Sequence, residues 1–445
     1  MFRRHPFWNV IVQPNLAAAA CAVAREIAGR LQDDELVKSA AERLDQQSLF
    51  SRRLPRRPFS VAGGSAGLAI LFAHLDNCFP TEGWDVVGHH HLLIAVKAAE
   101  EVRNLPLGLF AGWSGVAFAT WFLSRGGSRY RKLLAALDKK LLPEFIALPQ
   151  RLEEQRQGFA VEQFDLVSGL AGIGAYLLCR QEDPEVAGAL QSTLQSLVNL
   201  TREEGGVPYW HTPASLMSSK AWKIGYPDGY LNCGLAHGIP GPLVVLALAK
   251  SWRREVPGIA EALERTASWL LAHREDDAWG INWPFAVAVG RFDASFGSTQ
   301  PYRTAWCYGL PGVARSLWLA GEALDSSSYR EIAITAMKGI YQRPLAVRCI
   351  DSPTFCHGVA GLLQVTLRFA HDTGDPLFYE AANTLTEQIL SLYEPDTLLG
   401  YRHKETGENY VDQVSLLEGA AGVVLVLLAA STPKVPAWDR LFLLS

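Results

Sequence analysis

The stretch "GSAGLAILFAHL", from Gly64 to Leu75, is the first of a series of glycine elements that decides the fold. Each copy has two glycines three residues apart, followed by a strongly apolar run. Further copies begin at Gly112, Gly169, Gly238, Gly309, Gly358 and Gly419, which makes seven in all. One copy alone would indicate no more than a tight turn and a helix start, but seven in succession predict a repeat architecture.

Amphipathic segments separate the glycine elements. The segments that begin at Glu185, Gly258 and Phe378 have apolar residues at helical spacing and charged residues on the opposite face. A helix that is apolar nearly all round must be enclosed by other helices, whereas an amphipathic helix can face water. The sequence therefore predicts an all-α fold of inner and outer helices, an (α/α)7 toroid formed as a single domain over residues 1–445.

Two intervals between glycine elements are long enough to hold insertions, at about residues 201–232 and 279–303. Both are rich in glycine and aromatic residues, and the pattern of the second predicts short strands or loops. Each insertion directly precedes a reactive motif. Because loops on a rigid scaffold usually carry specificity, we expect both to contact the substrate.

The composition excludes several classes of partner. The chain is 49% hydrophobic with a net charge of -4, and no Lys/Arg-rich run interleaves with aromatic residues, so nucleic acid is not an expected partner. The longest apolar runs are too short to cross a bilayer. The seven cysteines, an odd number in a long chain, indicate reduced thiols. The sequence thus predicts a cytoplasmic protein without transmembrane helices.

Reactive side chains precede only some of the glycine elements. They are Asp165, His237, Cys307, Tyr308, Cys356 and His357. All lie just before an inner helix, at nearly equivalent positions of their repeats. A closed toroid would therefore bring these sequence-distant residues together at one end of its axis, where they would form one site.

Cys307, Cys356 and His357 form the predicted zinc site. Two thiolates and an imidazole match the ligand preferences of zinc, and three protein ligands leave a coordination position open, as in catalytic sites. Buried cysteines are also common as small hydrophobic residues, but Cys307 and Cys356 stand at matching positions of successive repeats. A rival interpretation makes Cys233 and His237 the metal ligands.

The three consecutive histidines His89, His90 and His91 resemble a metal-binding tract. However, consecutive side chains on a helix point in different directions. We expect a solvated turn at this position, before a helix that starts near Leu92.

The motifs "LAHGIPG", "WCYGLPG" and "CHGVAG" resemble those of the lanthionine synthetase C-like family, and in particular its standalone cyclases of class I lanthipeptides. The resemblance runs from about Gly64 to Gly422 and leaves both ends of the chain without an assigned motif. It implies a toroid of seven inner and seven outer helices around one zinc ion per chain, in agreement with the repeats counted above.

The activity implied by the resemblance is the formation of thioether rings, lanthionine and methyllanthionine. Cysteine thiols of a dehydrated precursor peptide would add to dehydroalanine or dehydrobutyrine in the same peptide. By the family match His237 is the general acid or base, Asp165 is its acidic partner, and Arg303 and Tyr308 lie near the site to stabilise an enolate oxygen. The alternatives are a helix-capping role for Asp165 and ordinary loop packing for Arg303 and Tyr308.

The resemblance also implies partners. The substrate would be a dehydrated lanthipeptide precursor with a leader and a core, and a separate dehydratase and a transporter would complete a biosynthetic complex. Such a complex would give this cytoplasmic protein a peripheral place at the membrane. Two other functions stay open: the addition of glutathione to dehydroamino acids in proteins, and a non-catalytic zinc-stabilised scaffold that binds peptides or glutathione.

Overall fold

The computed structural model describes residues 7–50, 57–155, 158–292 and 303–445. The chain divides into two compact units. Unit 1 comprises Met1–Pro106, Phe110–Leu134 and Ile350–Trp438, and unit 2 comprises Leu107–Leu109, Ala135–Cys349 and Asp439–Ser445. That residues 1–445 form a single domain stays a prediction, and each unit is described in turn.

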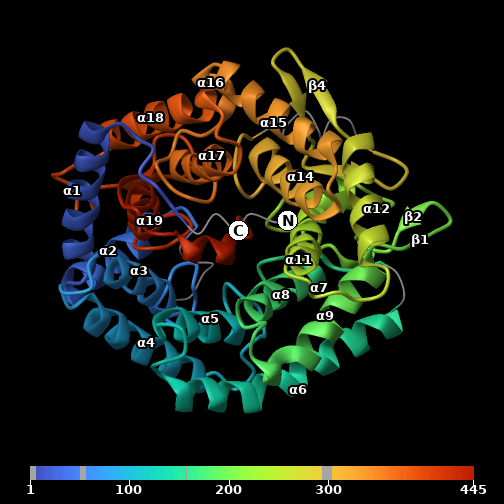
Figure 1. The fold of residues 1–445 in the computed structure, drawn as a ribbon, viewed down its shortest axis with the longest axis horizontal. Coiled ribbons are helices and arrows are strands. Elements are labelled where there is room, and N and C mark those ends of the chain that lie inside the picture. The colour runs from blue at the N-terminus through green and yellow to red at the C-terminus, as the bar shows by residue number, and fades with distance from the viewer. Residues whose placement is uncertain (1–6, 51–56, 156–157, 293–302) are drawn as a thin grey trace. The chain divides into compact units, whose positions relative to one another are not determined.

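Unit 1 contains four of the apolar helices that follow glycine elements, and several amphipathic helices. Its elements are α1 (Pro14–Leu31), α2 (Asp34–Gln47), α3 (Ser65–Cys78), α4 (Trp84–Glu100), α5 (Trp113–Leu123), α17 (Val359–Thr373), α18 (Pro376–Ser391), β7 (Arg402–Lys404), β8 (Tyr410–Asp412) and α19 (Ala420–Ser431). The apolar helices α3 and α17 each pack against the helix that follows in the chain, α4 and α18 (Figure 1). This is the predicted pairing of an inner with an outer helix.

The last repeat takes its outer helix from the N-terminal part of the chain, where the sequence shows no motif. Helix α1 packs against α19 (Figure 1), and its buried residues, among them Ala20, Ala24 and Ile27, lie at helical spacing. Just before α1, the indole Nε1 of Trp8 donates a hydrogen bond of 2.7 Å to the carbonyl oxygen of Ala429 in α19. The first helix therefore completes the seventh repeat.

Unit 2 repeats the same pairing with α8 and α9, α11 and α12, and α14 and α15. Its elements are α7 (Val161–Phe164), α8 (Leu170–Cys179), η2 (Pro184–Val186), α9 (Ala187–Leu200), β1 (Glu203–Glu204), β2 (Val207–Pro208), η3 (Ala214–Leu216), α10 (Lys220–Gly225), β3 (Tyr230–Asn232), α11 (Pro240–Ser251), α12 (Ile259–Ala272), β4 (Glu275–Asp277), β5 (Gly280–Asn282), β6 (Ala286–Ala288), α14 (Leu310–Leu324), α15 (Ser327–Gln342) and α16 (Leu345–Arg348). Helix α6 (Arg131–Gln155) and the short helix η4 (Ala437–Phe442) contain boundaries between the units.

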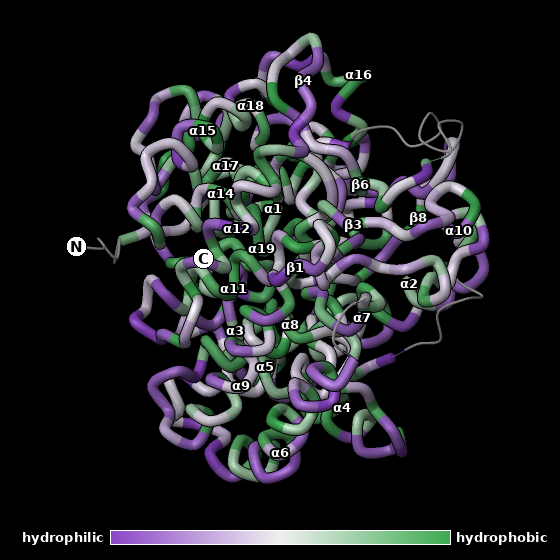
Figure 2. The backbone as a smooth tube through the Cα atoms, turned by 90° about the vertical axis from the view of Figure 1, so that its right-hand side faces the viewer, coloured by the Kyte–Doolittle hydropathy of each residue, from purple (hydrophilic) through white to green (hydrophobic). Residues whose placement is uncertain are grey.

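Seven apolar helices follow the seven glycine elements within the described residues: α3, α5, α8, α11, α14, α17 and α19. Figure 2 shows hydrophobic residues along α8 and α11, which are buried over nearly their whole length. A helix apolar on all sides is stable only when other elements enclose it, which the paired outer helices do here. No helix in the described part of the chain combines the length and the hydropathy that a membrane crossing requires.

The two predicted insertions form short strands. The first holds β1, β2, α10 and β3, and the described part of the second holds β5 and β6. Strands β3 and β6 pair in antiparallel fashion, with Leu231 opposite Val287, so the two insertions support each other. Residues 293–302 of the second insertion lie outside the described residues.

Backbone hydrogen bonds join the loops before successive inner helices. We call the two residues directly before the first glycine of each element its pre-glycine pair. In unit 1 the bonds run from Cys356 N to Leu417 O (2.8 Å), from Leu416 N to Ala62 O (2.9 Å) and from Val61 N to Phe110 O (2.9 Å). In unit 2 they run from Leu166 N to Ala236 O (3.2 Å) and from Ala236 N to Cys307 O (3.2 Å). The bonds donated by Cys356 and Ala236 each join two pre-glycine pairs, and each of the other three joins a pre-glycine pair to the residue directly before another pair. The loops of bonded repeats therefore lie side by side.

The glycines permit this close packing. A Cβ atom added to Gly172, the second glycine of the third element, would lie 2.2 Å from the carbonyl oxygen of Leu166 and 2.8 Å from Cβ of Leu109. Gly309 has a φ of +94°, a left-handed conformation that residues with side chains rarely adopt. The glycine elements are thus required by the fold and not only by the turn.

The prediction for the three histidines was wrong in its local structure. His89, His90 and His91 lie inside α4, because the helix begins at Trp84 and not near Leu92. Their side chains do diverge: His89 and His90 are exposed, whereas His91 is buried and stacks on Phe72. None of the three belongs to a group of metal-ligand residues among the described residues.

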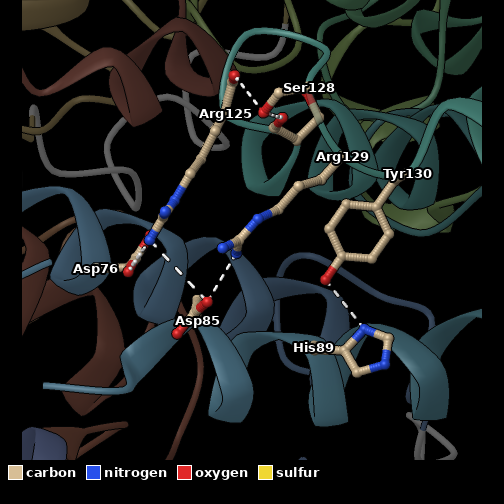
Figure 3. Close-up of polar contacts among 8 residues, drawn as sticks. Asp76, Asp85, His89, Arg125, Ser128, Arg129 and Tyr130 are labelled. Atoms are coloured by element: carbon tan, nitrogen blue, oxygen red, sulfur yellow. Dashed lines mark hydrogen bonds and ion pairs between the residues drawn. The ribbon is translucent and has the colours of Figure 1, made fainter. Parts of the chain in front are cut away.

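His89 instead helps to hold the connection between α5 and α6, which runs from Ser124 to Tyr130. Figure 3 shows its Nδ1 3.0 Å from the hydroxyl of Tyr130. In the same connection Arg125 Nε donates to Asp76 (2.9 Å), and Arg129 Nη1 pairs with Asp85 (2.7 Å). These contacts give the histidine a structural role.

We expect Gly172→Ala to destabilise the protein by about 1–3 kcal/mol, because the added methyl group meets backbone and side-chain atoms that are already packed. Gly188→Ala in α9 is the matched control, since nothing lies within 4 Å of its added Cβ and a helical alanine is favoured by at most about 1 kcal/mol. Urea unfolding of both variants measures the difference. Equal stability of the two variants would contradict the packing argument.

Candidate functional site

Asp165 and His237 form a buried pair in unit 2. The carboxylate of Asp165 is fully buried directly after α7, and its Oδ1 accepts hydrogen bonds from the backbone N–H groups of Ser168 (2.7 Å) and Gly169 (3.0 Å). Its Oδ2 lies 2.6 Å from Nδ1 of His237. Asp165 therefore orients the imidazole and holds the turn that precedes α8. It does not cap that helix, which has Gly169 as its N-cap residue and no side-chain capping bond.

This contact defines the state of His237. A carboxylate at Nδ1 accepts the proton of that nitrogen, which leaves Nε2 as the atom that can take up or release a proton. The side chain of His237 is 36% exposed, so Nε2 can meet a ligand. Burial opposes protonation of the ring, but the hydrogen bond and the charge of Asp165, helped by Cys307, outweigh it and raise the pKa of His237.

Tyr308 lies beside this pair. Its ring centroid is 6.1 Å from that of His237, and its hydroxyl accepts a hydrogen bond of 3.1 Å from Nδ2 of Asn232. Burial raises the pKa of Tyr308, so the phenol keeps its proton. The sequence analysis missed Asn232, since an asparagine at the end of an insertion carries no chemical signal of its own.

Cys307 and Cys233 lie in different surroundings. Cys307 is the first residue of the fifth pre-glycine pair and precedes Tyr308, and its carbonyl oxygen accepts the bond from Ala236 described above. Cys233 is 1% exposed, and its Sγ lies 3.7 Å from the carbonyl oxygen of Leu231. Burial raises the pKa of Cys233, and the candidate groups of metal ligands among the described residues do not include it.

Arg303 stands at the edge of the described residues, four positions before Cys307. It is half-buried, and its carbonyl oxygen packs against Gly309, where an added Cβ would lie 1.7 Å away. Its guanidinium forms no ion pair with any other described residue, so its part in the site stays a prediction.

Cys356 and His357 form the sixth pre-glycine pair, in unit 1. Both are half-buried, and their ligand atoms lie within 4.8 Å of each other. A thiol and an imidazole at this separation suit zinc, and partial exposure lets an ion and a further ligand reach them. Cys356 and His357 are therefore candidate metal ligands. In unit 2, Cys307 holds the same position before its glycine element as Cys356 holds before the next one.

Two residues near His357 were missed by the sequence analysis. The ring of His403, in β7, lies 5.4 Å from that of His357, and the ligand atoms of His357, His403 and Glu418 lie within 4.8 Å of one another. Glu418 could have been found, because it holds the same place in the seventh pre-glycine pair as His357 in the sixth. His403 could not, because a short hairpin far along the chain brings it here.

Comparison with known proteins agrees with the fold. A family model described as lanthionine synthetase C-like protein matches residues 55–443. The nisin biosynthesis protein NisC of Lactococcus lactis subsp. lactis is 26% identical over 385 residues, which span 83% of this chain and 84% of that protein. The solved structure of nisin cyclase superposes with a TM-score of 0.72 at 23% identity, covering 92% of this chain and 96% of that chain. The likeness confirms the predicted fold class, an all-α (α/α) toroid.

We expect Asp165→Asn to lower the pKa of His237 in the metal-free protein, because the opposite charge is lost. The amide oxygen can still accept the bonds from Ser168 and Gly169, so the turn before α8 is kept. NMR titration of the imidazole measures the shift. Asp228→Asn is the control, since the carboxylate of Asp228 pairs with Arg291 at 2.8 Å and not with His237.

The same pair makes stability depend on pH. Because the folded pKa of His237 is raised above 6.5, its contribution is fully present below that pH and is lost as the pH rises through the folded value. Asp165→Asn should flatten this dependence. An unchanged imidazole titration in that variant would show that Asp165 does not control His237.

Proposed function

Because the chain belongs to the lanthionine synthetase C-like family, we propose that it is a zinc-dependent cyclase, which forms lanthionine and methyllanthionine rings in a dehydrated precursor peptide. The observation that carries the proposal is the register of the reactive residues. His237, Cys307, Cys356 and His357 all fall in pre-glycine pairs of consecutive repeats. The similarity to proteins named for nisin biosynthesis and nisin cyclisation supports it.

We propose Cys307, Cys356 and His357 as the zinc ligands. The donor set fits the ion, since two thiolates and one imidazole are ligands that zinc prefers, and a set of three leaves one position open. When bound, zinc supplies a Lewis acid that holds the substrate thiol as a thiolate, although a free cysteine thiol has a pKa of about 8.5.

His237 is the proposed proton carrier. The thiol of the substrate gives its proton to Nε2 while Asp165 holds the Nδ1 proton and stabilises the charged ring. The sulfur then forms a bond to the β-carbon of the dehydro residue, and the π electrons of the double bond move towards the carbonyl oxygen. Return of the proton from Nε2 to the α-carbon completes the thioether, so atoms and charge balance.

Tyr308 and Arg303 are the proposed donors to the enolate oxygen. The raised pKa of Tyr308 keeps its hydroxyl protonated, and Asn232 fixes the position of that hydroxyl. A donor that is already placed where charge develops lowers the barrier without reorganising at the moment of reaction. Arg303 would add a permanent positive charge, since a guanidinium stays protonated.

The proposal extends to partners and location. The substrate is a dehydrated precursor with leader and core, and a separate dehydratase and a transporter act with the protein in a complex in the cytoplasm, at the membrane surface. The antiparallel pair β3 and β6, one strand from each insertion, contains Asn232, and we place the bound peptide beside it.

We expect the purified zinc-loaded protein to consume the thiols of a dehydrated, cysteine-containing precursor without added glutathione. Ring closure leaves the peptide mass unchanged, so mass spectrometry after thiol alkylation counts the thiols that remain. His237→Ala should slow the loss by about 100-fold or more, because a general acid-base group is removed. His273→Ala is the control, since that ring bonds the carbonyl of Trp269, outside the pre-glycine pairs.

Other outcomes of this assay would replace the proposal. If thiols of the peptide persist and glutathione becomes attached to the dehydro residues, the protein is a glutathione transferase of this family. If the peptide binds and neither reaction occurs, the protein is a scaffold.

We expect alanine in place of Cys307, Cys356 or His357 to weaken the binding of zinc, because a ligand of the proposed zinc site is lost. His237→Ala and Cys233→Ala should keep the ion. Elemental analysis after dialysis against a weak chelator measures both groups. Loss of zinc from His237→Ala would make His237 a ligand and would contradict the assignment.

A further inference from the structure

His357, His403 and Glu418 form a second group of metal-ligand residues, all within unit 1. We propose that this His2Glu group binds a divalent metal ion in its own right, at a position that shares His357 with the proposed zinc site. The proposed cyclase chemistry uses neither His403 nor Glu418. The inference shares one residue with the proposed function, but it needs neither Cys307 nor Cys356.

The backbone brings the three residues together. The hydrogen bond from Cys356 N to Leu417 O (2.8 Å) aligns the sixth and seventh pre-glycine pairs, so the next residues, His357 and Glu418, are neighbours. His403 comes from the β7–β8 hairpin, in which it stands opposite Val411. The β7–β8 hairpin and the loops before α17 and α19 thus bring the three side chains together.

A salt bridge ties that hairpin to the loop before His357. Nζ of Lys404, the residue after His403, lies 2.9 Å from a carboxylate oxygen of Asp351. The loop from Asp351 leads directly to Cys356 and His357. The hairpin is therefore held next to the glycine element and not merely packed near it.

The orientation of His403 matches that of a metal ligand. The residue is 5% exposed, and its Nδ1 lies 3.2 Å from Oγ of Ser352, which in turn lies 3.1 Å from Oγ1 of Thr354. Metal-binding histidines generally bond a second partner through the nitrogen that does not bind the metal. The rings of His403 and His357 meet edge to face, at 73°, so they do not stack face to face.

The separations allow coordination. The ligand atoms of the three residues lie within 4.8 Å of one another, and atoms bound to one zinc at about 2.0–2.2 Å stand roughly 3.5 Å apart. His357 and Glu418 are only half-buried, so small side-chain rotations can close this gap. Their exposure also gives an ion a way in.

The chemistry of the group differs from that of the cysteine site. Two imidazoles and one carboxylate suit Co²⁺, Ni²⁺, Mn²⁺ and Fe²⁺ as well as Zn²⁺, whereas thiolates select softer ions. An imidazole has two nitrogens, so His357 can serve either position. The position that is filled then depends on the ion and on whether the thiolates are present.

The test is a Co²⁺ titration of the Cys307→Ala/Cys356→Ala variant, followed by visible absorption and by calorimetry. We expect this variant to bind one Co²⁺ without a thiolate-to-cobalt charge-transfer band. Adding Glu418→Gln or His403→Ala to it should weaken binding by about 10-fold or more, because a ligand is lost. Glu408→Gln is the matched control, since the side chain of Glu408 is 84% exposed in the same hairpin.

The outcomes separate this inference from the proposed function. If the double cysteine variant binds no Co²⁺, or binds it equally well after Glu418→Gln and His403→Ala, the His2Glu position is refuted. If the unsubstituted protein shows no thiolate-to-cobalt band, the proposed zinc site fails instead.

A second measurement covers the case in which the double variant does not fold. In the Cys307→Ser/Cys356→Ser variant, whose side chains are closer in size to cysteine, Co²⁺ should bind at one position that Glu418→Gln weakens and Glu408→Gln keeps. Equal binding after Glu418→Gln, or no binding to this serine variant, would refute the inference.

Discussion

Backbone hydrogen bonds between neighbouring glycine elements are the interaction on which the rest of the structure depends. In unit 1 they link the sixth repeat to the seventh, the seventh to the first and the first to the second, and in unit 2 they link the third, fourth and fifth. Glycines allow neighbouring repeats to approach closely. At Gly312 of the fifth element, for example, an added Cβ would lie 2.8 Å from Cβ of Leu235, which directly precedes the fourth pre-glycine pair.

This constraint explains where the reactive residues stand. The bond between the fourth and fifth pre-glycine pairs, and the bond between the sixth and seventh, leave the second residues of the bonded pairs next to each other. In unit 2 these residues are His237 and Tyr308, an imidazole beside a phenol. In unit 1 they are His357 and Glu418, an imidazole beside a carboxylate. One structural repeat thus presents different chemistry at equivalent places, while the inner and outer helices stay alike.

The repeats could be predicted from the sequence, because each glycine element has two glycines three residues apart and an apolar run after them. The glycine elements predicted the apolar helices and their amphipathic partners, and the position of Asp165 and His237 before two of them anticipated a pair that the structure places 2.6 Å apart. Features that depend on contacts between distant parts of the chain were missed. Helix α1 completes the last repeat by a contact across almost the whole chain, and His403 arrives on a hairpin. The start of α4 was misplaced, because histidines were taken for turn residues.

The central claim is that residues of consecutive repeats hold one zinc ion with a position left for a thiol. X-ray absorption at the zinc edge of the purified protein tests it most directly. The account predicts two sulfur neighbours at about 2.3 Å and lighter neighbours at about 2.0–2.1 Å, with a third sulfur when a cysteine-containing dehydrated peptide is added. A first shell without sulfur, or one with four protein ligands that the peptide does not change, would contradict it.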